Sequence, residues 1–316
     1  MAQGGGKSPA KQPGGGRAGK SVPQLIEEEG RKLLDGGLND DETCVVCGHL
    51  AMLTSSQPEE APMQTLKDVL PRLMDLLSGS QQEATLQNAI AALAGSCALD
   101  PQLAEAAYNA GLVGRVCALL KENSSIRAIM ASDNAPSEAP EASPHAGTRT
   151  NLAVLVSSLA QSWPDAGTAL LENGAVAAVL DSLDLREDRE VVAAACDALC
   201  QLCTAEGVRP GLRGAGAVGA AARVLSTDDA ELAIRALLAI GMLVGRVKEE
   251  QRAALEELAG APGAVAALVR WMRGADGDCQ SVARDLFQGM SAEEGLKEQV
   301  LAALRAQEAG TDTFVN

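Results

Sequence analysis

The cysteines and histidines are the side chains of this sequence best suited to chemistry. Cys44, Cys47 and His49 follow one another at a spacing that could supply three ligands to a zinc ion. No fourth ligand lies close by, and the group of cysteines that begins at Cys196 could supply one only if the fold placed residue 44 beside it. We therefore expect these thiols to be small apolar packing residues, and we assign no metal site and no cofactor.

The sequence also lacks the usual groups for catalysis. Cys200 and Cys203 are expected on one helix, without the exposed helix N-terminus that lowers the pKa of a redox thiol. His49 and His145 are the only two histidines, and His145 falls in a Pro- and Ser-rich segment, so no rigidly held base is expected beside a nucleophile. The glycine-rich stretch 211–216 lacks the Gly-Lys-Ser/Thr ending of a phosphate-binding loop. We predict that the protein is not an enzyme.

Recurring phrases indicate the elements that hold these residues. Five phrases recur along the chain, and they begin at 68, 111, 174, 216 and 263. The first two are DVLPRLMDLL and GLVGRVCALL, and the last three are Gly-Ala-Val, each opening a similar apolar run. Their intervals are 43, 63, 42 and 47 residues, so three are near the length of one helical repeat and one is too long. No alternating strand pattern of useful length is present. The sequence predicts an all-α solenoid.

Composition favours closely packed helices and a cytoplasmic protein. The chain of 316 residues is 47% hydrophobic but only 2% aromatic, which suits thin, closely packed helices. It has no apolar run long enough to cross a membrane and no apolar signal peptide, and its eight cysteines mostly fall within helical patterns. We expect a reduced, monomeric protein in the cytoplasm.

Charge favours a basic partner. The net charge of -16 repels nucleic acid and anionic membranes and attracts cations. Three acidic runs, 27–29, 40–42 and 187–188, are either solvated helix faces or features that steer a basic tail.

Four segments are expected along the chain. Residues 1–21 are basic and rich in Gly and Pro, which predicts a disordered tail. Residues 22–308 form the repeat domain, and residues 309–316 form a C-terminal tail. A flexible insert at 132–148 accounts for most of the long interval.

Each repeat has an order of helices that resembles the armadillo repeat. A short helix ends near a glycine such as Gly174, an apolar helix such as 176–183 follows, and a longer helix such as 191–203 closes the unit. The resemblance implies a right-handed α-solenoid of about five to six repeats, in which the third helices line a concave groove. It also implies that the glycine allows the sharp turn between the first two helices.

Within that superfamily, the order of units resembles the SmgGDS family of small-GTPase GDP-dissociation stimulators. The stretches that carry the likeness are 42–47, 171–176 with 180–184, 236–244, and 268–272 with 284–287. The likeness implies binding to Rho and Rap type GTPases with basic, prenylated tails. The chain is much shorter than that family's members, which implies fewer repeats and a shorter groove.

The resemblance also indicates a candidate groove. Armadillo third helices often carry an asparagine that can pair with the backbone of an extended peptide. The matching positions here, none of them asparagine, are Ala92, Ser158, Gln201, Met242 and Gln288. A spacing of one helical turn adds further polar side chains to this face. The predicted partner-binding groove consists of Asn88, Ser158, Asp197, Gln201, Arg284 and Gln288.

These observations lead to three competing functions. The first is regulation of a small GTPase, as a GDP-dissociation stimulator, an exchange factor or a chaperone for prenylated GTPases with basic tails. The missing asparagines weigh against exchange activity more than against binding. The second is nucleotide exchange on an Hsp70-type chaperone, and the third is a non-catalytic interaction scaffold.

Overall fold

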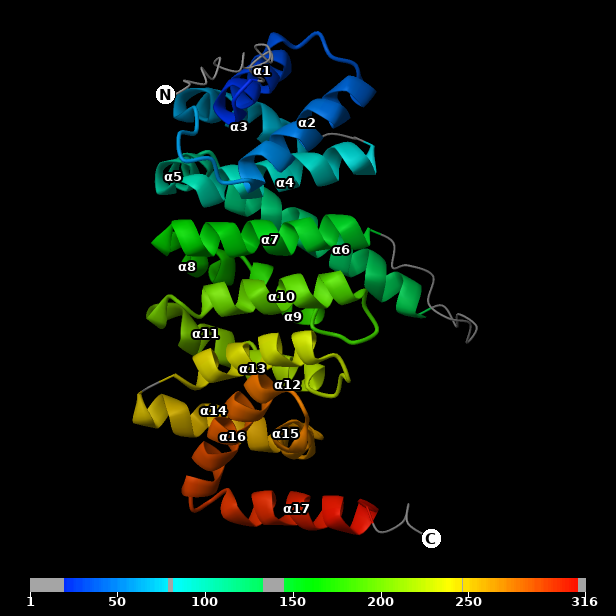
Figure 1. Ribbon diagram of the computed structural model, residues 1–316, viewed down its shortest axis with the longest axis vertical. Helices are drawn as coiled ribbons and strands as arrows, with labels where there is room; N and C mark the ends of the chain where they lie inside the picture. The colour runs from blue at the N-terminus through cyan, green and yellow to red at the C-terminus, as the bar shows by residue number, and fades with distance from the viewer. Residues whose placement is uncertain (1–19, 79–81, 133–144, 246, 312–316) are drawn as a thin grey trace, which may run out of the picture.

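The computed structural model describes residues 20–78, 82–132, 145–245 and 247–311. These residues form a long stack of helices with the N-terminal end of the chain at one end and the C-terminal end at the other (Figure 1). The described residues contain no β-strand. The predicted all-α architecture is confirmed.

Six long helices lie side by side on one face of the stack, which we call the third-helix face (Figure 1). They are α2 (Asp40–Ser55), α4 (Glu83–Leu99), α7 (Ala146–Ser162), α10 (Arg189–Leu202), α13 (Ala230–Val244) and α16 (Gly277–Ala292). Each packs against the next of the six, and α16 is inclined relative to the other five. The six helices match the predicted number of repeats.

The other helices form the rest of the stack. In chain order they are α1 (Val22–Asp35), α3 (Met63–Leu76), α5 (Pro101–Asn109), α6 (Leu112–Ser132), α8 (Pro164–Glu172), α9 (Ala175–Asp181), the 3₁₀ helix η1 (Glu206–Val208), α11 (Arg209–Gly214), α12 (Ala217–Val224), α14 (Lys248–Gly260), α15 (Ala264–Arg273) and α17 (Lys297–Thr311). The last of these, α17, packs against α15 and α16 at the C-terminal end.

Local sequence signals set several helix starts. Asn39 caps α2 through a capping box, in which its side chain accepts a hydrogen bond from the Glu42 amide at 2.9 Å and the Glu42 carboxylate accepts one from the Asn39 amide at 3.0 Å. The Asp229 side chain caps α13 by accepting hydrogen bonds from the backbone amides of Glu231 and Leu232. This cap places the start of α13 at Ala230.

The glycines of the recurring phrases form the turn into the second helix of a repeat. Gly174, Gly216 and Gly263 have φ of 79°, 82° and 75°, and each is the residue directly before a helix. This left-handed conformation is costly for residues with a Cβ, which explains why glycine recurs there.

The predicted insert lies between α6 and α7, and its central residues, 133–144, lie outside the described residues. Its last three residues were assigned wrongly, because α7 already begins at Ala146. Thr148 and Arg149 are buried there, and Arg149 forms a buried ion pair with Glu187. Because α7 packs directly on both α4 and α10, the insert leaves the row of third helices continuous.

The predicted tails fall largely outside the described residues, which begin at Lys20 and end at Thr311. At the N-terminal end, α1 begins at Val22, the predicted start of the repeat domain. At the C-terminal end, α17 extends three residues beyond the predicted boundary at 308.

Close approach between third helices depends on small residues. Gly95 of α4 faces Thr54 of α2, and a Cβ placed on Gly95 would lie 2.9 Å from the Thr54 Cβ. Thr54 cannot easily yield, because it is buried and its hydroxyl donates a hydrogen bond to the Leu50 carbonyl at 2.8 Å. The α2–α4 packing therefore requires glycine at position 95.

We predict that Gly95→Ala destabilises the protein by about 1–3 kcal/mol, because overpacking outweighs the helix propensity gained from alanine. Gly241→Ala is the matched control, since Gly241 also lies inside a third helix but has open space around its missing Cβ. The control should be stabilising by about 0.5–1 kcal/mol. Urea unfolding of the three proteins measures both effects, and equal changes in the two variants would contradict the packing argument.

Candidate functional site

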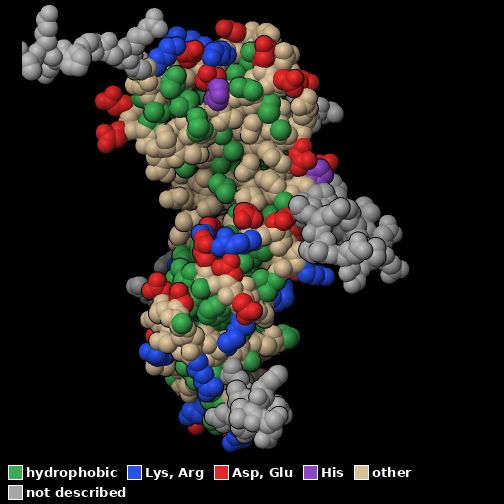
Figure 2. All heavy atoms as spheres, turned by 45° about the vertical axis from the view of Figure 1, so that its right-hand side comes forward, with side chains coloured by type: hydrophobic (Ala, Val, Ile, Leu, Met, Phe, Trp, Pro, Cys, Tyr) green, Lys and Arg blue, Asp and Glu red, His purple; other side chains and the backbone are tan. Residues whose placement is uncertain are grey.

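The third-helix face exposes several large apolar side chains. Val45 and Met52 of α2, Val154 of α7 and Leu238 of α13 are all more than two-fifths exposed. Figure 2 shows a mainly uncharged surface between the charged N-terminal end and a band of charged side chains near the middle of the molecule. Of these four residues, Val154 lines the hollow described next, and Val45 lines a separate pocket between α1 and α2.

A hollow of about 280 Å³ opens where α2, α4 and α7 meet. We call it the small-residue hollow, because most of its lining is small. Its lining residues are Thr54, Ser55, Gln57, Ala91, Ala94, Gly95, Ala98, Asn151, Val154 and Ser158. The short side chains of α4 leave space that longer ones would fill, and this space is large enough for a partner's side chain.

Ser158 is the one predicted groove residue in the lining of this hollow. It is 7% exposed, and among the described residues no side chain or carbonyl pairs with its hydroxyl. By contrast, the buried hydroxyls of Thr54 and Ser96 donate to carbonyls four residues back, at 2.8 Å and 2.7 Å. The Ser158 hydroxyl can therefore donate to or accept from a molecule in the hollow.

Asparagines link successive third helices. The Asn88 side-chain nitrogen donates to the Cys44 carbonyl at 3.0 Å, and that of Asn151 donates to the Gln87 carbonyl at 2.9 Å. Asn88 was predicted as a contact residue, yet its donor group is engaged within the protein. Sequence reasoning missed Asn151, whose position 63 residues after Asn88 was the available signal.

The offset of 63 residues also corrects the α4 position that was expected to match Ser158. Ala92 was taken as the α4 equivalent of Ser158, but it is fully buried and does not reach the surface. Gly95 stands 63 residues before Ser158, and both line the small-residue hollow. Residues 91–98 of α4 include five alanines, glycines or serines besides Ala92, so that hydrophobic periodicity does not define the register there.

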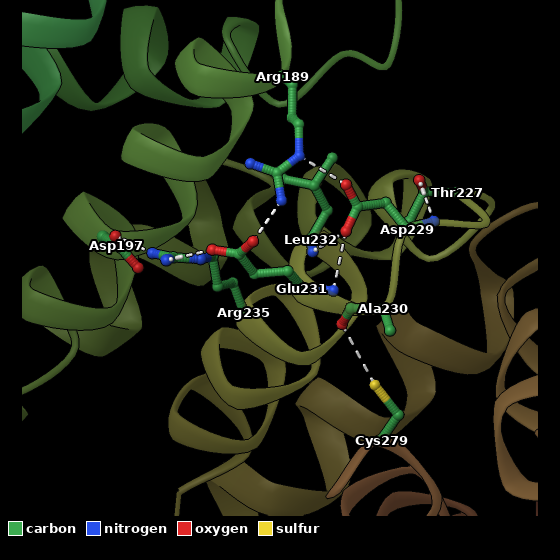
Figure 3. Close-up of polar contacts among 9 residues, drawn as sticks. All are labelled: Arg189, Asp197, Thr227, Asp229, Ala230, Glu231, Leu232, Arg235 and Cys279. Carbon is green, nitrogen blue, oxygen red and sulfur yellow. Dashed lines mark hydrogen bonds and ion pairs between the residues drawn. The ribbon is translucent and has the colours of Figure 1, made fainter. Parts of the chain in front are cut away.

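A charged cluster joins α10 and α13 (Figure 3). Arg189 Nε lies 2.7 Å from Asp229 Oδ2, and its guanidinium also pairs with Glu231. Arg235 Nη2 lies 3.0 Å from Glu231 Oε1 and also pairs with Asp197. The predicted contact residue Asp197 is therefore already held by an arginine of the next repeat.

The arginines lower the pKa of acids that they bind. Hydrogen bonding to Arg189 holds the pKa of Asp229 below its ordinary value, and hydrogen bonds from Arg189 and Arg235 do the same for Glu231. Both acids stay ionised, and the two arginines offset most of the charge of the cluster's three acids. This part of the face is therefore close to charge balance rather than strongly acidic.

The remaining predicted residues lie nearer the C-terminal end. Gln201 is half-buried near the end of α10, and Met242, another expected asparagine position, is half-buried on α13. Arg284 and Gln288 are exposed on the inclined helix α16, where the Arg284 guanidinium lies 3.5 Å from Gln280 Oε1. The structure does not gather the six predicted residues into one pocket.

The cysteines are placed as packing residues. Cys47 is fully buried, whereas His49 is exposed and its Nδ1 lies 3.6 Å from Glu29 Oε1. Burial raises the pKa of Cys47, Cys196 and Cys203 to about 12, so these thiols stay protonated at neutral pH. In the part of the chain that the structure describes, no three His, Cys, Asp or Glu residues are grouped so that they could hold a metal ion.

None of the described helices combines the length and the apolar character needed to cross a bilayer.

Comparisons with known proteins connect this geometry to a fold. No protein-family model matches the chain, and no curated protein matches it. Among solved structures, the designed armadillo repeat protein YIII(Dq)4CqI is 18% identical with a TM-score of 0.61, over 85% of this chain and 99% of that chain. The designed armadillo repeat protein YIII(Dq.V1)4CPAF, in complex with peptide (KR)4, is 17% identical with a TM-score of 0.62 over the same shares.

A third neighbour is an engineered protein from a structural genomics consortium, with 17% identity and a TM-score of 0.65. It likewise covers 85% of this chain and 99% of its own. The likeness shows that the chain has the armadillo-type α-solenoid fold, which confirms the fold predicted from the repeats. At this level of identity the likeness extends to the fold alone.

We predict that Arg189→Gln raises the pKa of Asp229 and Glu231 toward their ordinary values of 3.8 and 4.5. Because the folded values lie below the ordinary ones, the stability gained from the cluster is complete above those ordinary values and is lost as the pH falls through the lowered ones. The stability difference between wild type and variant should therefore be present at neutral pH and shrink below about pH 4.

NMR titration of the side-chain carboxyl carbons measures the two pKa values. Arg252→Gln serves as the control, because it removes a guanidinium paired with Glu256 on α14, outside the cluster. Unchanged carboxyl titrations in Arg189→Gln would show that the cluster does not persist in solution.

Proposed function

We propose that the protein is a non-catalytic binding protein that holds an extended basic segment of a partner along its third-helix face. The partner that we propose is a small GTPase with a basic, prenylated C-terminal tail. The small-residue hollow carries the proposal, because it offers both space and an uncommitted hydroxyl at the centre of three packed helices. An extended chain crossing α2, α4 and α7 would place one side chain in the hollow and a backbone group beside Ser158.

Long-range electrostatics supports a basic segment. The net charge of -16 attracts cations over distances that increase as ionic strength falls. The charged cluster contributes little to this attraction, because Arg189 and Arg235 offset most of the charge of its acids. Attraction should therefore come from the summed field of the molecule, with the hollow supplying the local fit.

The neighbour solved with peptide (KR)4 supports the same chemistry. Since the two proteins share a fold but little sequence, the comparison supports a basic peptide as the class of ligand.

The lining favours binding over catalysed GDP release. None of the positions matched to groove asparagines carries an asparagine, and the two asparagines that lie near the hollow use their amide nitrogens to join helices. We therefore assign the chain the role of a holder or chaperone of the GTPase rather than an efficient exchange factor.

Capture of partners at two ionic strengths tests the assignment. We expect prenylated, Lys-rich GTPases to bind the full chain at about 50 mM NaCl and to dissociate at about 500 mM. Faster ADP release from an Hsp70, without any GTPase binding, would instead identify a chaperone exchange factor. Absence of both would leave a scaffold and overturn the proposal.

We predict that Ala91→Arg weakens GTPase binding about 10-fold or more, because it fills the small-residue hollow and adds a positive charge there. Ala302→Arg on α17 is the matched control, since it makes the same change at an exposed position at the opposite end of the stack. Isothermal titration calorimetry with a geranylgeranylated basic-tail peptide measures the affinities. Equal losses in both variants would show that net charge alone governs binding.

A further inference from the structure

A second pocket lies at the N-terminal end of the molecule, between α1 and α2 and apart from the small-residue hollow. Its volume is about 380 Å³, and its lining combines apolar and charged side chains. The lining residues are Glu29, Lys32, Leu38, Asp41, Glu42, Val45, Val46 and His49. Acidic and hydrophobic side chains mingle over this end of the molecule in Figure 2.

Glu29 is the unusual member of this lining. Its side chain is only 10% exposed, yet its Oε2 has no hydrogen-bond partner among the described residues. A buried carboxylate oxygen without a donor is costly, because desolvation is not offset by a hydrogen bond. Because Oε2 itself is closed to solvent, a cation entering the pocket would reach the Glu29 carboxylate through Oε1, the oxygen that Lys32 holds.

In the described part of the chain, Lys32 is the ammonium group that pairs with Glu29, and His49 Nδ1 lies 3.6 Å from the same Oε1. Lys32 Nζ lies 2.9 Å from Glu29 Oε1 and 3.4 Å from Glu28 Oε1. The Lys32 side chain is 44% exposed, so it can move onto Glu28 without being buried. A second ammonium group can then share or take over the Glu29 carboxylate.

The rest of the pocket complements a long alkylammonium group. Leu38, Val45 and Val46 provide apolar wall for a butyl chain, and Asp41 adds a carboxylate at the exposed rim. Glu42 is less available, because its Oε2 accepts from the Asn39 amide in the helix cap. An apolar stem that ends in an ammonium group is the chemistry of lysine.

We propose that the α1–α2 pocket binds a lysine side chain of a partner polypeptide, with the ammonium on Glu29 and the alkyl chain against Leu38, Val45 and Val46. This site is independent of the proposed GTPase function, because it requires only an accessible lysine. Lysine fits better than arginine, because a guanidinium binds a carboxylate through both oxygens at once, whereas only Oε1 of Glu29 can be reached from the pocket.

The test is a titration of the full chain with a fluorescent peptide of alternating lysine and glycine, (KG)4, at about 50 mM NaCl. Amide NMR shifts at Val45 and Val46 locate the binding. The same peptide with norleucine in place of lysine keeps the alkyl chain and removes the charge, so it should produce neither shift. Glu29→Gln should weaken (KG)4 binding about 10-fold.

Glu172→Gln is the control, because it makes the same charge change at an exposed site on α8. If Glu29→Gln does not fold, Val45→Lys replaces it, since Val45 is 54% exposed and a lysine there would place a competing ammonium at the pocket. Equal weakening by Glu29→Gln and Glu172→Gln would overturn the proposal in favour of general charge attraction. Equal binding of the norleucine peptide, or unshifted Val45 and Val46 amides during (KG)4 binding, would overturn it as well.

Discussion

The close approach of neighbouring third helices is the constraint on which the rest of the molecule depends. Gly95 leaves no room for a Cβ against Thr54, and the residues of α4 that line the hollow beside it, Ala91, Ala94 and Ala98, are all alanine. Short side chains allow the helices to pack closely, and they also leave the small-residue hollow on the outer surface. The packing that holds the N-terminal repeats together and the space available to a ligand thus have the same origin.

Interactions between repeats are polar as well as apolar. Asn88 and Asn151 donate to carbonyls of the preceding third helix, and the Arg189 and Arg235 guanidiniums join α10 to α13. These contacts engage groups that would otherwise be available to a partner. Part of the polar character of the third-helix face therefore serves assembly of the solenoid, which leaves the Ser158 hydroxyl as an exception.

The repeat architecture could be predicted from the sequence because glycine-led phrases recur at similar intervals. Gly174, Gly216 and Gly263 each precede a second helix, as the pattern indicated. The candidate site could be predicted less well from the sequence. Apolar periodicity could not separate Ala92 from Gly95 in a helix of small residues, and long-range pairs such as Arg235–Asp197 have no local signature. The pocket around Glu29 also depends on how α1 and α2 pack, which no spacing reveals.

One helix, α2, contributes to both cavities. Val45 lines the N-terminal pocket and Ser55 lines the small-residue hollow, ten residues further along the helix. At 1.5 Å per residue these positions are about 15 Å apart along the helix axis. An extended polypeptide advances about 3.3 Å per residue, so a partner that filled both cavities would need its two side chains about four to five residues apart. The length of α2 would then define the spacing of a linear sequence motif, with a lysine at one end and a hollow-filling side chain at the other.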